Sequence, residues 1–197
     1  PTQNTSDLIK AVRSCKTAAQ ERDVIAKEAA ALRAAFRDDV ATGSLGGGST
    51  SSGGGSGVLA GGSGVGALFR HRNVAKLMYM HMLGYPSHFG QMEALKLVAS
   101  PGFAGKRIGY LALSVLLDER QEVLMLVTNS LKNDLNSADQ YVVGLALAAL
   151  AAVASKGMAV DLAPEVARLC CHSSAYVRKK AAAAAVRLLS RAPKRSL

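Results

Sequence analysis

The stretch KRIGYLALSVLLDERQEVLMLVTNSLKNDL, from Lys106 to Leu135, decides the fold class. Its apolar residues recur at spacings of three and four, once before the charged turn at residues 118–121 and again after it. This spacing places them on one face of a helix in each half. We therefore predict two helices folded back on each other. Neither helix can bury its apolar face alone, so the pair needs neighbours of the same kind.

The same pattern repeats with a period of 35 residues. Gly109 of KRIGYLALSVLL is followed 35 residues later by Gly144 of QYVVGLALAALA, and a fainter copy, AYVRKKAAAAAVRLL, places Lys179 a further 35 residues on. Helix pairs at such a period are typical of HEAT and armadillo repeats. The sequence therefore predicts an all-α protein, a right-handed α-solenoid of HEAT/armadillo-like helical hairpins with about nine helices.

Composition divides the chain into three segments. Residues 1–41 are predicted to form the first helical hairpin, and residues 67–197 carry the helical repeats. Residues 42–66 between them contain 12 Gly and 6 Ser, which predicts a flexible insertion. The insertion includes GGSGVGAL, but a phosphate-binding loop is excluded because no predicted strand precedes it and no Lys-Ser/Thr follows Gly66.

The net charge of +10 is unevenly distributed, since nine basic residues stand against two acidic ones from Lys156 to the end. This excess predicts an acidic partner, and it leaves nucleic acid, an anionic membrane and an acidic protein open. Three cysteines without a paired framework favour a reducing compartment. The longest uncharged apolar run, residues 141–155, is shorter than the about 20 residues that cross a bilayer. No secretory signal is predicted either.

No catalytic or metal-binding set is predicted. The sequence offers no combination of nucleophile, base and orienting group, so we expect no enzyme and no cofactor. His81 and His88 lie on either side of a predicted helix break, and the adjacent Cys170, Cys171 and His172 lack the spacing of metal ligands. These patterns favour a structural or binding protein.

One basic cluster is predicted to lie where a helix begins. Its members are Arg70, His71, Arg72 and Lys76. Up to four cations and the unpaired backbone N–H groups of a first helical turn could then face one anion. The alternative is a solvated rim with nothing bound.

A second basic group comprises Arg178, Lys179 and Lys180. We interpret it as solvated or facing another subunit, because single-stranded nucleic acid would need several aromatic residues there and the region offers only Tyr176. A basic helical-repeat scaffold that binds nucleic acid or an acidic nuclear partner is kept as the alternative function.

Nearly the whole chain outside residues 42–66 resembles the gamma class of the adaptin large-chain family. The long segments HMLGYPSHFGQMEALKL and KRIGYL are highly specific to adaptin large chains, and DERQEVLMLVTNSLKNDLN favours the gamma class over the alpha class. The opening LIKAVRSCKTAAQERDVIAKEAAALRAAFRDD and the continuation YVVGLALAALAAVASKGMAVDLAPEVARL are also similar to the family. The resemblance is to the N-terminal trunk, and the chain begins without Met, so we expect a piece of a longer protein.

The resemblance implies a large-subunit trunk of a clathrin-associated adaptor complex in vesicle-mediated intracellular protein transport. The implied partners are a small, a medium and a second large subunit, an Arf-type GTPase, membranes with phosphatidylinositol 4-phosphate, and dileucine-type cargo tails. Clathrin would bind only through regions absent from this chain, and nucleic acid is not expected. The implied location is cytoplasmic, peripheral on trans-Golgi network and endosomal membranes and on clathrin-coated vesicles.

The resemblance also assigns residues. The phosphoinositide site of adaptin large chains falls on Arg70, His71, Arg72 and Lys76, and VRSCK places an arginine that contacts the acidic part of dileucine signals at Arg13. The family joins its second and third helices by a few polar residues. The Gly/Ser insertion departs from this pattern and is expected to loosen the edge of the lipid site.

Overall fold

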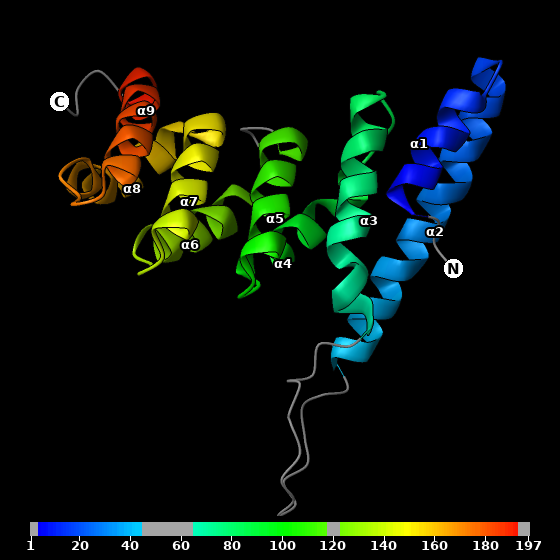
Figure 1. Cartoon of the computed structure of the whole chain (residues 1–197), viewed down its shortest axis with the longest axis horizontal. Coiled ribbons are helices and arrows are strands. Elements are labelled where there is room, and N and C mark those ends of the chain that lie inside the picture. The colour runs from blue at the N-terminus through cyan, green and yellow to red at the C-terminus, as the bar shows by residue number, and fades with distance from the viewer. Residues whose placement is uncertain (1–3, 45–64, 118–122, 193–197) are drawn as a thin grey trace, which may run out of the picture. The chain divides into compact units, whose positions relative to one another are not determined.

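The computed structural model describes residues 4–44, 65–117 and 123–192. Within these ranges the chain forms nine α-helices and one short 3-10 helix, with no strand (Figure 1). The elements are α1 (Thr5–Ser14), α2 (Ala18–Ser44), α3 (Val65–Met82), η1 (His88–Gly90), α4 (Gln91–Ala99), α5 (Phe103–Leu116), α6 (Val123–Leu135), α7 (Gln140–Val153), α8 (Lys156–Cys170) and α9 (Ala175–Arg191). The all-α prediction is confirmed.

The helices gather into two compact units, residues 1–93 and residues 94–197. In the N-terminal unit, α1, α2 and α3 each pack against the other two. Their shared core contains Leu8 of α1, Leu32 of α2, and Val74 and Leu77 of α3, none of which has any exposed area. The start of α2 is fixed by Thr17, whose Oγ1 accepts a hydrogen bond from the Gln20 N–H at 3.3 Å.

Both helices beside the Gly/Ser segment are longer than predicted. Helix α2 continues to Ser44 and α3 begins at Val65, so each extends two or three residues into the predicted 42–66 insertion. The remainder of that insertion, residues 45–64, lies outside the described residues.

The C-terminal unit is a stack of helical hairpins in two layers. Helices α5, α7 and α9 pack side by side in one layer, and α6 packs against α8 in the other (Figure 1). The hairpins are α6 with α7 and α8 with α9, so the stretch Lys106–Leu135 holds the last helix of one hairpin and the first helix of the next. Both predicted helices are present, but α6 folds back most closely on α7 and not on α5.

The 35-residue repeat places glycines where helices approach one another. A Cβ at Gly109 of α5 would lie 2.8 Å from the Val98 backbone N and 3.0 Å from the Ala94 backbone O. A Cβ at Gly144 of α7 would lie 2.4 Å from the Tyr176 ring. Glycine at these two positions therefore permits the close packing of α5 on α4 and of the Tyr176 ring on α7.

A buried polar link joins the end of α6 to α5. Lys106 Nζ donates to Asp134 Oδ1 at 2.8 Å, and the Tyr110 hydroxyl donates to Asp134 Oδ2 at 2.6 Å. Burial, and then the hydrogen bond to Asp134, raise the pKa of Tyr110. None of the described helices is long and apolar enough to cross a membrane.

Candidate anion-binding and docking surfaces

The predicted basic cluster does not lie at a helix start. Helix α3 begins at Val65, so Arg70 is its sixth residue and the unpaired backbone N–H groups belong to residues 65–68. Those donors and the four cations do not share one turn. Helix α3 begins earlier than predicted, because the glycines near Val65 resembled the end of a linker.

Lys76 is separated from the other three cations, which corrects its predicted role in an exposed site. It has 0% exposed area, and its Nζ lies 2.5 Å from Oε1 of Glu28 in α2. Helical periodicity explains this position, since Lys76 shares a face with the buried residues Asn73, Leu77 and Met80. The amine links α3 to α2 inside the unit and does not face solvent.

The other three members of the cluster have different surroundings. Arg70 is half-buried and its Nε lies 3.0 Å from Oε2 of the buried Glu93, so its charge is compensated. His71 is exposed. Arg72 is half-buried, with its guanidinium 5.2 Å from the centroid of the Phe69 ring. Arg72 is therefore the cluster member whose charge no carboxylate compensates in the described part of the chain, and the exposed His71 lies next to it in the sequence.

Arg13 lies exposed in the last turn of α1. A cation at this end of a helix is favoured by the helix dipole even without a ligand. The exposure of Arg13 agrees with the contact to dileucine signals that the resemblance implies. The helix dipole alone, however, also accounts for an arginine at this position.

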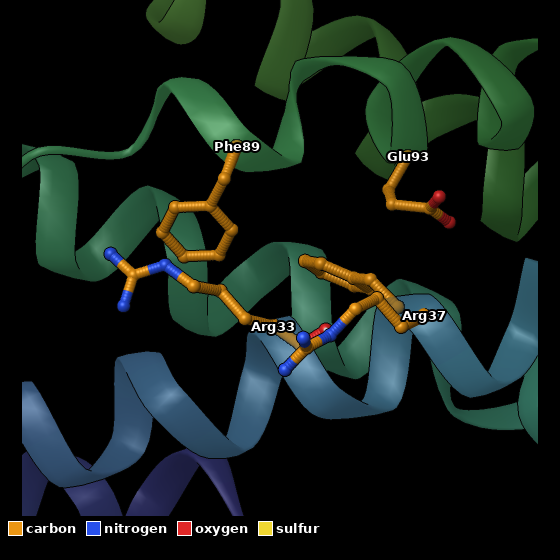
Figure 2. Close-up of a pocket in the computed structure, with 5 residues that line it drawn as sticks. Arg33, Arg37, Phe89 and Glu93 are labelled. Atoms are coloured by element: carbon orange, nitrogen blue, oxygen red, sulfur yellow. The ribbon is translucent and has the colours of Figure 1, made fainter.

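The structure contains a pocket beside α2 that was not predicted from the sequence. The pocket has a volume of about 490 Å³ and is lined by Arg33, Phe36, Arg37, Phe89 and Glu93 (Figure 2). The Arg33 guanidinium lies 4.5 Å from the Phe89 ring centroid, and the Phe36 and Phe89 rings are 6.3 Å apart. The residues come from segments about 50 positions apart in the sequence. Only the spacing of Arg33, Phe36 and Arg37 could have indicated one mixed cationic and aromatic face.

The C-terminal unit carries an apolar surface on the layer of α5, α7 and α9. A groove of about 260 Å³ between α5 and α7 is lined by Arg107, Tyr110, Leu111, Ser114, Leu145, Ala148, Ala149 and Ala152. Phe103, Tyr141 and Tyr176 follow one another across the three helices, with ring centroids 6.5 and 6.0 Å apart. We call this groove and its aromatic row the C-terminal helix face.

The aromatic row corrects one sequence inference. Tyr176 is not the only aromatic residue in its region, because Tyr141 and Phe103 lie beside it from earlier repeats. Of the nearby cations, Arg178 binds the backbone before α9, since its Nη1 donates to the carbonyl oxygens of His172 and Ser173 at 2.8 and 2.7 Å. Among the described residues, no three His, Cys, Asp or Glu side chains group as metal ligands.

Comparison with known proteins places this fold in a family. Residues 67–196 match the family model described as the adaptin N terminal region. AP-1 complex subunit gamma-2 of Arabidopsis thaliana is 53% identical over 188 residues, which are 95% of this chain and 19% of that protein. The human AP-1 complex subunit gamma-like 2 is 46% identical over 196 residues, which are 100% of this chain and 22% of that protein.

Comparison of the fold also finds an adaptor complex. The chain is similar to part of a homology model of the full-length AP-3 complex in an intermediate open conformation, with a TM-score of 0.55 and 32% identity over 60% of this chain and 21% of that chain. The sequence therefore spans about a fifth of the length of its relatives. The match over residues 67–196 and the stacked helical hairpins together show that the chain belongs to the adaptin family.

Proposed function

We propose that the chain is the N-terminal trunk segment of a large subunit of a clathrin-associated adaptor complex and acts in vesicle-mediated protein transport. The similarity to AP-1 gamma subunits over 95% or more of this chain carries the proposal. The role is structural, because the segment presents surfaces to other molecules and does not transform a substrate. Its site of action is the cytoplasmic side of the trans-Golgi network and endosomes, where it acts with an Arf-type GTPase.

A sister subunit, the small one in particular, covers the C-terminal helix face. Helix α7 carries no charged side chain from Gln140 to Val153, yet Tyr141 is 57% exposed and Ala148 and Ala152 are exposed as well. Leu111 of α5 is 55% exposed beside them. An exposed apolar surface of this kind is what a stable protein interface buries.

Co-purification with the small subunit tests this docking surface. The double variant Leu111→Glu/Ala148→Glu places two carboxylates in the groove and should reduce recovery of the small subunit at least about tenfold, since unpaired charges are excluded from interface cores. Met125→Glu is the control, because Met125 is 77% exposed on α6, in the other layer. Equal recovery with the double variant and the control would remove the proposed face.

The membrane contact is assigned to the exposed part of α3. Arg72 supplies positive charge for a phosphatidylinositol 4-phosphate headgroup, His71 supplies a ring N–H donor, and Phe69, which is 36% exposed, lies beside them. Flotation of the assembled complex on vesicles containing that lipid should be weakened by His71→Glu/Arg72→Glu. Arg22→Glu/Lys27→Glu on the exposed face of α2 is the matched control. Unchanged flotation of the α3 variant would end this assignment.

Arg13 is proposed to receive the acidic residue of a dileucine-type cargo tail together with the small subunit. The assembled complex with Arg13→Gln should bind such a peptide more weakly in fluorescence anisotropy, and the loss should disappear when the acidic residue of the peptide is replaced by glutamine. An equal loss with both peptides would show that Arg13 acts on folding or assembly instead.

A further inference from the structure

The pocket formed by α2, η1 and the first turn of α4 combines two cations with an aromatic floor. Arg33 and Arg37 are one turn apart on α2, and Phe36 between them is 6% exposed. Figure 2 shows the two arginines rising from α2 while Phe89 and Glu93 come from the segment that faces it. Cationic groups above phenyl rings are suited to a ligand that is anionic at one end and apolar at the other.

The floor of this pocket is held in place by the fold. Gly90, directly after Phe89, lies so close to α3 that a Cβ there would come within 2.1 Å of Leu77 Cδ2. Glycine lets η1 lie against the buried Leu77 side chain without displacing the end of that side chain. Phe89 is thereby held 6.3 Å from Phe36, and the two rings are tilted by 46°.

The cations are also oriented before any ligand arrives. The Arg33 guanidinium lies over the Phe89 ring, which leaves its in-plane N–H groups directed away from the ring face. Arg37 Nε donates to the Arg33 carbonyl oxygen at 3.3 Å, which restrains the second guanidinium. Orientation before binding reduces the entropy lost on binding.

The charge of the lining is positive. Glu93 is its one acidic residue, and its carboxylate is already held by Arg70 Nε at 3.0 Å. Neither Arg33 nor Arg37 forms an ion pair with any residue that the structure describes. A carboxylate entering from outside would therefore meet two uncompensated guanidinium groups.

We propose that this pocket binds an acidic peptide segment in which a carboxylate lies next to a bulky apolar side chain. The carboxylate pairs with Arg33 and Arg37, and the apolar side chain rests on Phe36 and Phe89. An inositol phosphate satisfies the arginines only, because its hydroxyl-covered ring gains nothing from the phenyl floor. A volume of about 490 Å³ accommodates one large side chain and its neighbour.

This site is separate from the one proposed around Arg13. Arg13 precedes the start of α2 by only a few residues, whereas Arg33 lies about 22 Å further along the axis of α2 at 1.5 Å per residue. The two sites can therefore be tested independently, and failure of one leaves the other standing.

Fluorescence anisotropy with labelled hexapeptides tests the proposal on the whole chain. The probe carries two adjacent Glu residues followed by Phe, and its companions replace either both Glu by Gln or the Phe by Ser. Only the unmodified probe should bind well. The variant Arg33→Gln/Arg37→Gln should raise its Kd at least about tenfold, because both cations that pair with the carboxylates of the probe are removed.

Arg22→Gln/Lys27→Gln is the matched control, since it removes two exposed cations from the same helix. Arg22 even repeats the local geometry of Arg37, because its Nε donates to the carbonyl oxygen four residues earlier. The control variant should bind the probe like the unmodified chain. The proposal is overturned if both double variants weaken binding equally, if the Ser-containing peptide or inositol phosphate binds as well as the probe, or if the probe does not bind.

Discussion

Asp134 illustrates how single polar residues hold this protein together. Asp134 as a residue is 9% exposed. Its carboxylate accepts hydrogen bonds from Lys106 and Tyr110, which both belong to α5. Lys76 and Glu28 form an equivalent buried pair in the N-terminal unit. Removing one member of such a pair leaves a buried charge without its counter-charge, which costs far more than the intact pair contributes.

The first prediction concerns Asp134→Ala. This variant should lower the free energy of unfolding by about 3 kcal/mol, because Lys106 loses its counter-charge and the Tyr110 hydroxyl loses its acceptor. Asn133→Ala, at the exposed neighbouring position on α6, is the control and should change it by no more than about 0.5 kcal/mol. Urea unfolding followed by circular dichroism measures both. Similar values for the two variants would contradict the role given to the buried link.

A second prediction follows from the raised pKa of Tyr110. The folded protein keeps the phenol protonated at pH values where the unfolded chain, with the ordinary pKa of 10.0, releases the proton. The stabilisation is therefore present below about pH 10 and is lost as the pH rises above it. In urea titrations between pH 8 and 11, Tyr110→Phe should show a shallower loss of stability than the unmodified chain. Tyr141→Phe, at an exposed tyrosine, should keep the original slope.

At the scale of helices, close approach depends on where glycine falls in the repeat. Gly109 brings α5 against the backbone of α4, and nothing in that backbone can rotate away from an added methyl group. Gly157 in α8 occupies an open position, where a Cβ would have no neighbour within 4 Å. The same substitution is thus expected to have opposite effects at the two sites.

The third prediction uses this contrast. Gly109→Ala should destabilise the protein by about 1 to 3 kcal/mol through overpacking, although alanine is the better helix former. Gly157→Ala should leave stability unchanged or raise it by up to about 1 kcal/mol. Thermal unfolding of both variants measures the difference. A stable Gly109→Ala variant would mean that α4 and α5 are not in close contact.

The helices were predicted well from the sequence, because a helix that buries one face carries apolar residues three or four positions apart. This spacing did not predict which helices pair, since α6 could have folded back on either neighbour. Lys76 was misplaced because cations were grouped by sequence distance, whereas burial depends on the helix face. The pocket lined by Arg33 and Phe89 was not predicted, because these two residues lie far apart in the sequence.

At the scale of the whole molecule, the two units present different chemistry. The N-terminal unit has cations set on aromatic rings, at Arg33 with Phe89 and at Arg72 with Phe69. The C-terminal unit exposes an apolar groove and an aromatic row. Binding of small charged ligands and docking of a large apolar partner should therefore be separable by mutation.

The fourth prediction tests that separation. Leu111→Glu/Ala148→Glu should reduce recovery of the small subunit at least about tenfold and leave the anisotropy signal of the acidic probe unchanged. Arg33→Gln/Arg37→Gln should weaken binding of the probe and leave recovery of the small subunit unchanged. Loss of both activities in either variant would show that the units depend on each other. Circular dichroism spectra of the two variants provide the check on folding.

The uncharged length of α7 has a consequence for the life of the chain in a cell. If a sister subunit covers this face, as proposed, a newly made copy that lacks the subunit leaves the apolar side chains of Tyr141, Ala148 and Ala152 in water, and self-association is one way to bury them. Synthesis in excess of the sister subunit would then produce aggregates and mark the surplus for degradation. The proposed docking helix would then also limit how many unassembled copies stay free of aggregation.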